Sequence, residues 1–484
     1  MEKKNRKYYP LGLFVVSLLF VTIFSRATSF LYAYEGFDAA IFKQMGMALL
    51  KDKILYVDYF DNKGCLLYFI QAFGLWLGGN LPILLMQAVS LTITLWIWER
   101  ILALYLNPKE RLIRLVVLLV LLLCFYEGGD LTEEWCLPFA SYPILLYFKS
   151  LKQNTAIRNG QMFLIGVCFG IIAFIRVNNA SPFLGFLAFY WIQQLLKKEF
   201  RSFFRTLSLF VLGTFLIVGI CIIYFYAKAG WYGVREMVYA TFLSNLEYLS
   251  LKVNRPLINI VFYVWTIVVL VVWLIHNTKK EKAILIPSLL SILVFIGTFG
   301  RLAITHYFMA LIPLITVGLT QFRKDQLNRI LFILALPFFL FYVSKPMIFV
   351  TNDLVLNNEK EKLIYADFQH CLEAVPLEER DSICNYNLFG FGESMLFHEG
   401  ILQNNRICFS LISKNMSGFW DGNKGNVTPT KWILLSWDYS FEDSDAAYIL
   451  NYYEETCSFE HNRIYFTKPQ MGDTFQVKLY RRRE

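Results

Sequence analysis

Charge is scarce in this 484-residue sequence, in which acidic and basic residues together make up 17%. Soluble domains usually carry about 25%. The sequence also has no G-x-x-x-x-G-K-[ST] phosphate loop, no close Cys/His ligand pattern and no repeat of the length typical of solenoids. These absences weigh against a soluble domain, a P-loop nucleotide site, a zinc site and a solenoid.

Long apolar runs take the place of charge, and 56% of the residues are hydrophobic. Because a helical span needs about 20 apolar residues, we predict about eleven transmembrane helices. The first run follows a basic start and continues past Ser25 and Arg26 with no small-residue cleavage site, so we expect a retained span. The predicted spans lie near residues 11–32, 81–106, 111–127, 133–150, 160–176, 180–197, 205–228, 256–276, 282–299, 302–321 and 327–349.

The net charge of +9 comes from basic residues that cluster at the ends of apolar runs. This placement follows the positive-inside rule and argues against a nucleic-acid partner. We therefore expect a multi-pass protein of the cell membrane with a cytoplasmic N-terminus. An odd number of spans then places the C-terminal tail outside the cytoplasm.

The first predicted external loop, residues 33–80, contains two helical patterns. Residues 37–51 place Phe37, Ile41, Met45 and Leu49 along one face, which is typical of an interfacial helix. Residues 64–79 are apolar but too short to cross the hydrocarbon comfortably as a helix. We interpret them as a re-entrant or interfacial helix.

The composition changes after the transmembrane region, residues 1–349. Short strand-like segments such as KWILLSWD and FQVKLYRR predict a small extracytoplasmic α/β domain over residues 350–484. Its four cysteines, Cys371, Cys384, Cys408 and Cys457, allow two disulfides in three pairings. Free or buried thiols are the equal alternative.

Unusual polar residues gather at the outer edge of the predicted bundle. Ionisable groups in or near the hydrocarbon are costly and usually functional, and a transporter would place some of them near mid-membrane. Their one-sided position favours a surface reaction site. The residues are Asp38, Asp61, Lys63, Glu133, Glu134, Arg176, Arg301 and His306.

This inventory suits displacement of a phosphate from a sugar carbon. The external face has no nucleotide sugars, so a donor must arrive through the membrane, and a lipid-linked phosphate fits. The reaction requires one carboxylate base for the acceptor's proton and cations for the leaving phosphate. Carboxylates together with Lys63, Arg176 and Arg301 match that need.

Two segments of the first loop, GFDAAIF and ILYVDYFDNKGCLLYFI, carry a family resemblance. They resemble the first external loop of GT-C glycosyltransferases of the protein-O-mannosyltransferase-like and aminoarabinose-transferase-like group. GDLTEEWCLPF, FIRVNN and GRLAITHYFMALIPL also resemble blocks that recur in bacterial members in the same order. The resemblance covers roughly residues 10–320.

The resemblance implies a GT-C membrane enzyme that takes a sugar from a polyprenyl-phosphate donor and inverts its anomeric centre. Asp38 would be the base and Lys63 would bind the lipid phosphate. Glu133 and Glu134 would shape the acceptor side or a site for a divalent cation. Two departures stand out: Cys65 replaces the usual proline, and no acid adjoins Asp38, which weighs against a metal-assisted variant.

Each of these residues also has a purely structural interpretation. Asp38 would suit the N-cap of a helix over residues 39–51, and Lys63 would snorkel to the interface. Asp61 would order its loop, and Glu133 and Glu134 would favour a helix N-terminus. Arg176 and Arg301 would anchor helix ends, and His306 would be a packing residue.

We therefore predict an inverting membrane glycosyltransferase. Its partners would be the bilayer, a polyprenyl-phosphate sugar and an external acceptor hydroxyl on a surface polysaccharide, a lipid-linked glycan or a protein. No cofactor follows with certainty, and a divalent cation stays open. The alternatives are a transporter or flippase of a lipid-linked glycan, and a non-catalytic scaffold.

Overall fold

The computed structural model describes most of the chain. The described residues are 9–27, 35–245, 257–299, 304–322, 325–351, 358–386, 391–404, 430–436, 451–462 and 474–483. Arg301 and Cys408 lie outside these ranges. The predictions made for them therefore stay predictions.

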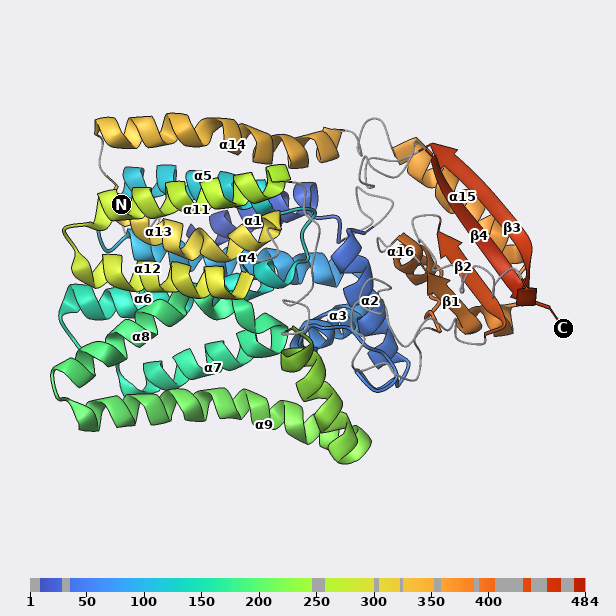
Figure 1. Cartoon of the computed structure of the whole chain (residues 1–484), viewed down its shortest axis with the longest axis horizontal. Helices are drawn as coiled ribbons and strands as arrows, with labels where there is room; N and C mark the ends of the chain where they lie inside the picture. Colours follow the sequence, from blue (N-terminus) through green and yellow to red (C-terminus); the bar gives the residue numbers. More distant parts are fainter. Residues whose placement is uncertain are drawn as a thin grey trace.

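Most of the chain forms a bundle of long helices, drawn horizontally in Figure 1, and a smaller α/β part lies at one end of it. The bundle consists of α1 (Tyr9–Phe24), α4 (Asn80–Leu102), α5 (Pro108–Phe125), α6 (Thr132–Gln153), α7 (Asn159–Arg176), η1 (Val177–Ala180), α8 (Ser181–Leu196), α9 (Phe200–Val238), the π-helix η2 (Tyr239–Leu243), α11 (Leu257–Thr278), α12 (Lys282–Phe299), η3 (Thr305–Leu311), α13 (Ile312–Thr320) and α14 (Gln326–Thr351).

Within the described residues, five helical segments are long and apolar enough to cross a membrane: Asn80–Leu102, Asn159–Leu196, Phe200–Leu243, Ile260–Thr278 and Lys282–Phe299. The segment Asn159–Leu196 contains two of the predicted spans, because η1 separates α7 from α8. The predicted spans near 11–32, 111–127, 133–150 and 302–321 correspond to shorter or more polar helices, and the span near 327–349 lies within α14, which has 26 residues. Helical membrane architecture is therefore supported, and the number of eleven stays a prediction.

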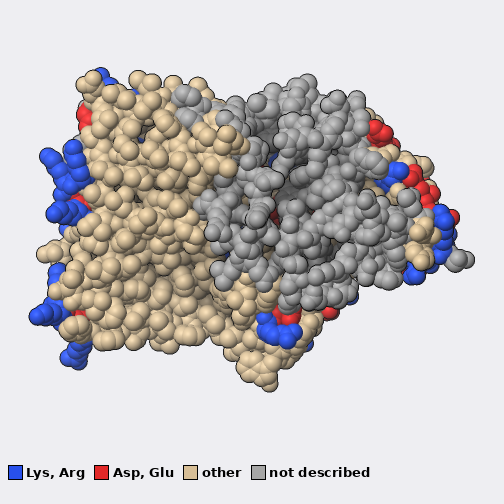
Figure 2. Space-filling model, in the orientation of Figure 1, with Lys and Arg blue, Asp and Glu red and all other residues tan. Residues whose placement is uncertain are grey.

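Basic side chains gather at the end of the bundle that lies opposite the α/β part, as Figure 2 shows. Three connections at that end, between α6 and α7, α8 and α9, and α11 and α12, carry lysine or arginine, and Arg100 and Lys109 flank the connection between α4 and α5. This distribution agrees with the predicted orientation, in which the α/β part is extracytoplasmic.

Close backbone contact joins α7 to α9. A Cβ atom on Gly166 of α7 would lie 2.0 Å from the carbonyl oxygen of Phe210 in α9, so only glycine fits there. Small residues that allow such an approach are typical of helix pairs in membranes. This packing fixes the position of Arg176, the last residue of α7.

The first external loop contains α2 (Phe37–Leu50) and α3 (Cys65–Gly78), as predicted, and the two helices pack on each other. With 14 residues, α3 is about 21 Å long, which is short for a span. Burial on α2 extends beyond the predicted apolar face, which includes the buried Ile41 and Met45. Its polar residues Lys43 and Gln44 are buried as well, because the C-terminal part covers them.

The C-terminal part has its own hydrophobic core, which includes Phe368, Trp432 and Leu479. Its elements are α15 (Asn358–Glu373), η5 (Leu377–Ser382), β1 (Ile383–Tyr386), α16 (Phe391–His398), β2 (Trp432–Ser436), β3 (Tyr453–Asn462) and β4 (Thr474–Arg482). The sheet order is β1-β2-β4-β3, with β1 parallel to β2 and the other pairs antiparallel. KWILLSWD and FQVKLYRR correspond to β2 and β4.

One disulfide joins Cys371 of α15 to Cys457 of β3. Cys384 is a buried free thiol. Only one of the three pairings that the sequence left open links Cys371 with Cys457, and the disulfide in the structure belongs to that pairing.

Candidate functional site

Asp38 lies in the first turn of α2 and does not cap it. Gly36 is the N-cap residue, with extended φ/ψ of −61° and 156° and no side-chain capping bond. The capping role considered for Asp38 is therefore wrong, and its carboxylate remains available for other contacts. The side chain is half-buried.

The segment Asp61–Gly64 forms a tight turn before α3. Asp61 accepts hydrogen bonds from the Tyr68 hydroxyl and the Asn62 backbone N–H, both at 2.7 Å. Lys63 Nζ lies 2.6 Å from Asn62 Oδ1 and 3.8 Å from Asp61 Oδ1. The Tyr56 hydroxyl donates to the Lys63 carbonyl at 2.7 Å. Asp61 thus orders the turn that presents Lys63.

Gly64 attaches this turn to α7. Its N–H donates to the carbonyl of Ile175 at 3.0 Å. A Cβ atom at this position would lie 2.0 Å from the Phe174 carbonyl oxygen, so a side chain cannot be accommodated. The glycine therefore brings Lys63 close to the end of α7, where Arg176 lies.

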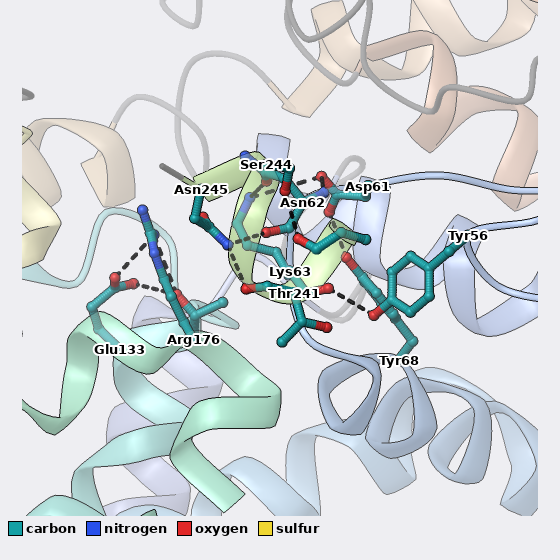
Figure 3. Close-up of polar contacts among 12 residues, drawn as sticks. Tyr56, Asp61, Asn62, Lys63, Tyr68, Glu133, Arg176, Thr241, Ser244 and Asn245 are labelled. Carbon is teal, nitrogen blue, oxygen red and sulfur yellow. Dashed lines mark hydrogen bonds and ion pairs between the residues drawn. The ribbon is translucent and has the colours of Figure 1, made fainter. Parts of the chain in front are cut away.

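The π-helix η2 and the residues after it cover the turn from the other side. Asn245 Nδ2 donates to the Asn62 carbonyl at 3.0 Å and to the Thr241 carbonyl at 2.8 Å. In the view of Figure 3, Asn245 lies between the Glu133–Arg176 pair and the turn that contains Lys63. The turn that contains Lys63 is therefore held by two segments that are far apart in sequence, the end of α7 and the residues that follow η2.

The two glutamates that begin α6 point to different neighbours. Arg176 Nη1 lies 3.2 Å from Glu133 Oε1 and forms an ion pair with it. Glu134 instead accepts hydrogen bonds from the Tyr126 hydroxyl at 2.8 Å and the Asp130 N–H at 2.8 Å. Glu133 therefore faces the site, while Glu134 belongs to a buried network behind it.

Arg176 is buried at the outer end of α7. It donates to the Tyr307 hydroxyl at 2.7 Å, and its guanidinium lies 4.5 Å from the centre of the Tyr307 ring. These contacts, with the ion pair to Glu133, hold a cation in a fixed orientation. A fixed guanidinium is well suited to a phosphate, because its donors form a planar fork.

His306 lies on η3 beside the loop between α5 and α6. Its Nδ1 is 2.7 Å from Glu127 Oε2. Glu127 and Asp130 both adopt positive φ, of 41° and 54°, which is uncommon for residues other than glycine. Such a conformation requires support from its surroundings and often marks a functional loop.

Several of these charged groups influence the pKa of Asp38. Burial raises the pKa of Asp38 above its ordinary value of 3.8, because the charged form loses hydration. Lys63, His306 and Arg176 oppose this increase, and Glu133 adds to it. Asp38 therefore lies within electrostatic range of Lys63, Glu133, Arg176 and His306, and Asp61 lies 3.8 Å from Lys63.

The arrangement offers a carboxylate with a raised pKa opposite several cations. Such a carboxylate suits a general base, and the cations suit an anionic group that gains charge. Within the described part of the chain, no three His, Cys, Asp or Glu residues gather closely enough to hold a metal ion.

Sequence reasoning missed three supporting residues. Tyr307 adjoins the predicted His306 and was detectable as part of the same block. Glu127 begins an E-G-G-D turn, whose paired glycines indicate a special backbone. Asn245 carries no sequence signal, because its partner is a backbone carbonyl 183 positions away.

No family model matches the chain, and no curated protein matches its sequence. Among solved structures, the chain is similar to the archaeal oligosaccharyltransferase AglB from Archaeoglobus fulgidus, solved with an inhibitory peptide and a dolichol-phosphate. The match covers 97% of this chain and 74% of that chain, with 12% identity and a TM-score of 0.46. A likeness at this level carries no argument about activity, so the function is proposed from the residues themselves.

Proposed function

We propose that the protein is an inverting membrane glycosyltransferase that moves a sugar from a polyprenyl-phosphate donor to an external acceptor hydroxyl. The observation that supports the proposal is the setting of Asp38 in the first turn of α2, where burial raises the pKa of its carboxyl and the positive charges of Lys63, His306 and Arg176 lower it. The proposed site lies at the end of the bundle that adjoins the α/β part, and the basic residues gather at the opposite end.

In the proposed reaction, Asp38 accepts the proton of the acceptor hydroxyl. The acceptor oxygen forms a bond to the anomeric carbon while the bond from that carbon to the phosphate oxygen breaks. The electron pair leaves with the polyprenyl phosphate, which requires no protonation. Attack from the side opposite the leaving group inverts the anomeric centre.

Lys63 and Arg176 would hold the leaving phosphate. Lys63 acts as a compact charge, while the guanidinium of Arg176 provides directional donors. Glu133 keeps Arg176 in place through the 3.2 Å ion pair, and Glu127 does the same for His306 at 2.7 Å. Arg301, predicted as a further phosphate contact, lies outside the described residues.

Asp38→Asn tests the proposal in membranes supplied with polyprenyl-phosphate sugars. The variant should lose transfer by a factor of roughly 100 or more, because a general base contributes about that much. Asp52→Asn is the matched control. Asp52 is exposed in the same loop and has a φ of 57°, a conformation that asparagine tolerates, so its activity should persist.

Transfer at the wild-type level by folded Asp38→Asn protein would remove Asp38 as the base. If that variant also moved a lipid-linked glycan across the bilayer without bond cleavage, the transporter alternative would replace the enzyme. Mass spectrometry of surface glycans in a deletion strain would identify the sugar and acceptor by the residue that disappears.

A further inference from the structure

A buried polar junction connects the α/β part to the first external loop. We define this junction as Glu35, Lys43, Ser394 and His398. Lys43 Nζ lies 2.9 Å from Glu35 Oε1, and both side chains are completely shielded from solvent. A buried ion pair outside the proposed reaction centre calls for an explanation, because removing two charges from water is costly.

Two side chains of α16, Ser394 and His398, contact Glu35. The Ser394 hydroxyl donates to Glu35 Oε2 and accepts the Glu35 backbone N–H at 3.3 Å. His398 Nε2 lies 3.1 Å from the same Oε2 atom. Burial by itself would raise the pKa of Glu35, but Lys43, His398 and Ser394 together hold it below its ordinary value.

On the opposite side, Lys43 connects α2 to the bundle. Its Nζ donates to Asn80 Oδ1 at 2.7 Å, at the start of α4, and to the carbonyl of Ala27. The next residue, Gln44, donates from Nε2 to the carbonyls of Glu393 and Ile401, both at 3.1 Å. The helix α2 is therefore held between the bundle and the α/β part by polar contacts on both sides.

Two residues of the junction, Glu35 and Lys43, flank the proposed base Asp38 in the sequence. Glu35 precedes Asp38 by three positions and Lys43 follows it by five, so the ion pair spans the first turn of α2. Neither Glu35 nor Lys43 carries a role in the proposed chemistry. Their contacts fix where that first turn lies and how it is rotated.

We infer that the α/β part positions the reaction site: Ser394 and His398 hold Glu35, the Glu35–Lys43 pair fixes the first turn of α2, and that turn places Asp38. Ser394 and His398 are thus positioning residues rather than catalytic ones. The consequence for catalysis rests on the proposed function of Asp38, whereas the docking of α2 does not.

Hydrogen exchange of the α2 amides in the full-length protein tests the docking. Ser394→Ala removes both hydrogen bonds to Glu35, so exchange should accelerate by about tenfold to a hundredfold, as expected for bonds to a charged group. Lys51→Met is the matched control. Lys51 connects the same two parts through an exposed pair with Asp381 at 3.0 Å, and its loss should change exchange by less than about fivefold.

Unchanged α2 exchange in folded Ser394→Ala protein would overturn the docking. Ser394→Thr keeps the hydroxyl and should restore slow exchange, which distinguishes the hydrogen bond from packing. If the Ser394→Thr protein folds like wild type but its α2 amides still exchange fast, that result would also count against the inference.

Turnover of a polyprenyl-phosphate sugar tests the effect on Asp38. Ser394→Ala should lower kcat by about tenfold or more and leave the donor KM unchanged, because Lys63 and Arg176 are untouched. Unchanged kcat with faster exchange would overturn the positioning role. If Asp38→Asn itself keeps activity, the proposed function has failed, and the exchange result still decides whether the α/β part holds α2.

Discussion

Gly64→Ala provides a sharp test of how the site is assembled. The glycine joins the turn that carries Lys63 to the end of α7 through the bond from Gly64 N–H to the Ile175 carbonyl at 3.0 Å. An alanine Cβ would lie 2.0 Å from the oxygen, 2.1 Å from the carbon and 2.7 Å from the Cα of Phe174. All three are backbone atoms, so no side-chain rotation relieves the contact.

The clash between the alanine Cβ and the Phe174 backbone can be relieved only if the turn moves away from α7. Ordinary contact begins at 3.4 Å, so the Cβ and oxygen atoms must move apart by 3.4 − 2.0 = 1.4 Å. Displacements of about 1 Å can lower turnover by about 100-fold when a reacting group is misplaced. Overpacking of this kind costs about 1–3 kcal/mol in the free energy of unfolding. Lys63 is the adjacent residue, so donor binding should weaken as well.

Purified Gly64→Ala protein would be compared with wild type for donor turnover, donor KM and thermal unfolding. Gly160→Ala is the control, because Gly160 lies on the same helix α7 and a Cβ there meets nothing within 4 Å. Wild-type turnover and melting temperature in Gly64→Ala would refute the close contact between the first loop and α7.

Two further predictions concern the same loop. Asp38 must be ionised to act as a base, so activity should fall as the pH drops through its raised pKa, and the acid midpoint of kcat/KM should lie above 3.8; a midpoint at or below 3.8 would contradict the burial of Asp38. Cys65→Pro should keep activity and change the free energy of unfolding by no more than about 1 kcal/mol. Cys65 is the first residue of α3, a favourable position for proline, and Gly64 before it is extended, with φ −75° and ψ 151°. A loss of turnover comparable to that of Gly64→Ala would show that the thiol of Cys65, 3.6 Å from that of Cys221, is required.

The first external loop shows how far local sequence reasoning reaches. The apolar spacing predicted both α2 and α3, because helical periodicity is a local property. It did not predict that Lys43 and Gln44 would be buried. Their burial depends on α16, which lies about 350 positions further along the chain, and no local pattern contains that contact.

The acidic pair of α6 illustrates the same limit at the candidate site. Glu133 and Glu134 are adjacent and chemically equivalent, so sequence gave no basis for choosing between them. The helix separates their directions by roughly 100°, given 3.6 residues per turn. Packing then directs Glu133 to Arg176 and Glu134 to Tyr126.

By itself, the sequence determined the membrane character of the chain, the distribution of its basic residues, the α/β character of its C-terminal part and the residues that attract attention at the outer edge. Hydrophobic length, charge placement and strand patterns are properties of short segments, so they can be recognised without a fold. Only the tertiary structure decided that Asp38 is not a helix cap, that Arg176 pairs with Glu133, and that α16 holds α2. Each of these depends on segments that meet only after the helices pack, through contacts whose partners are distant in the chain.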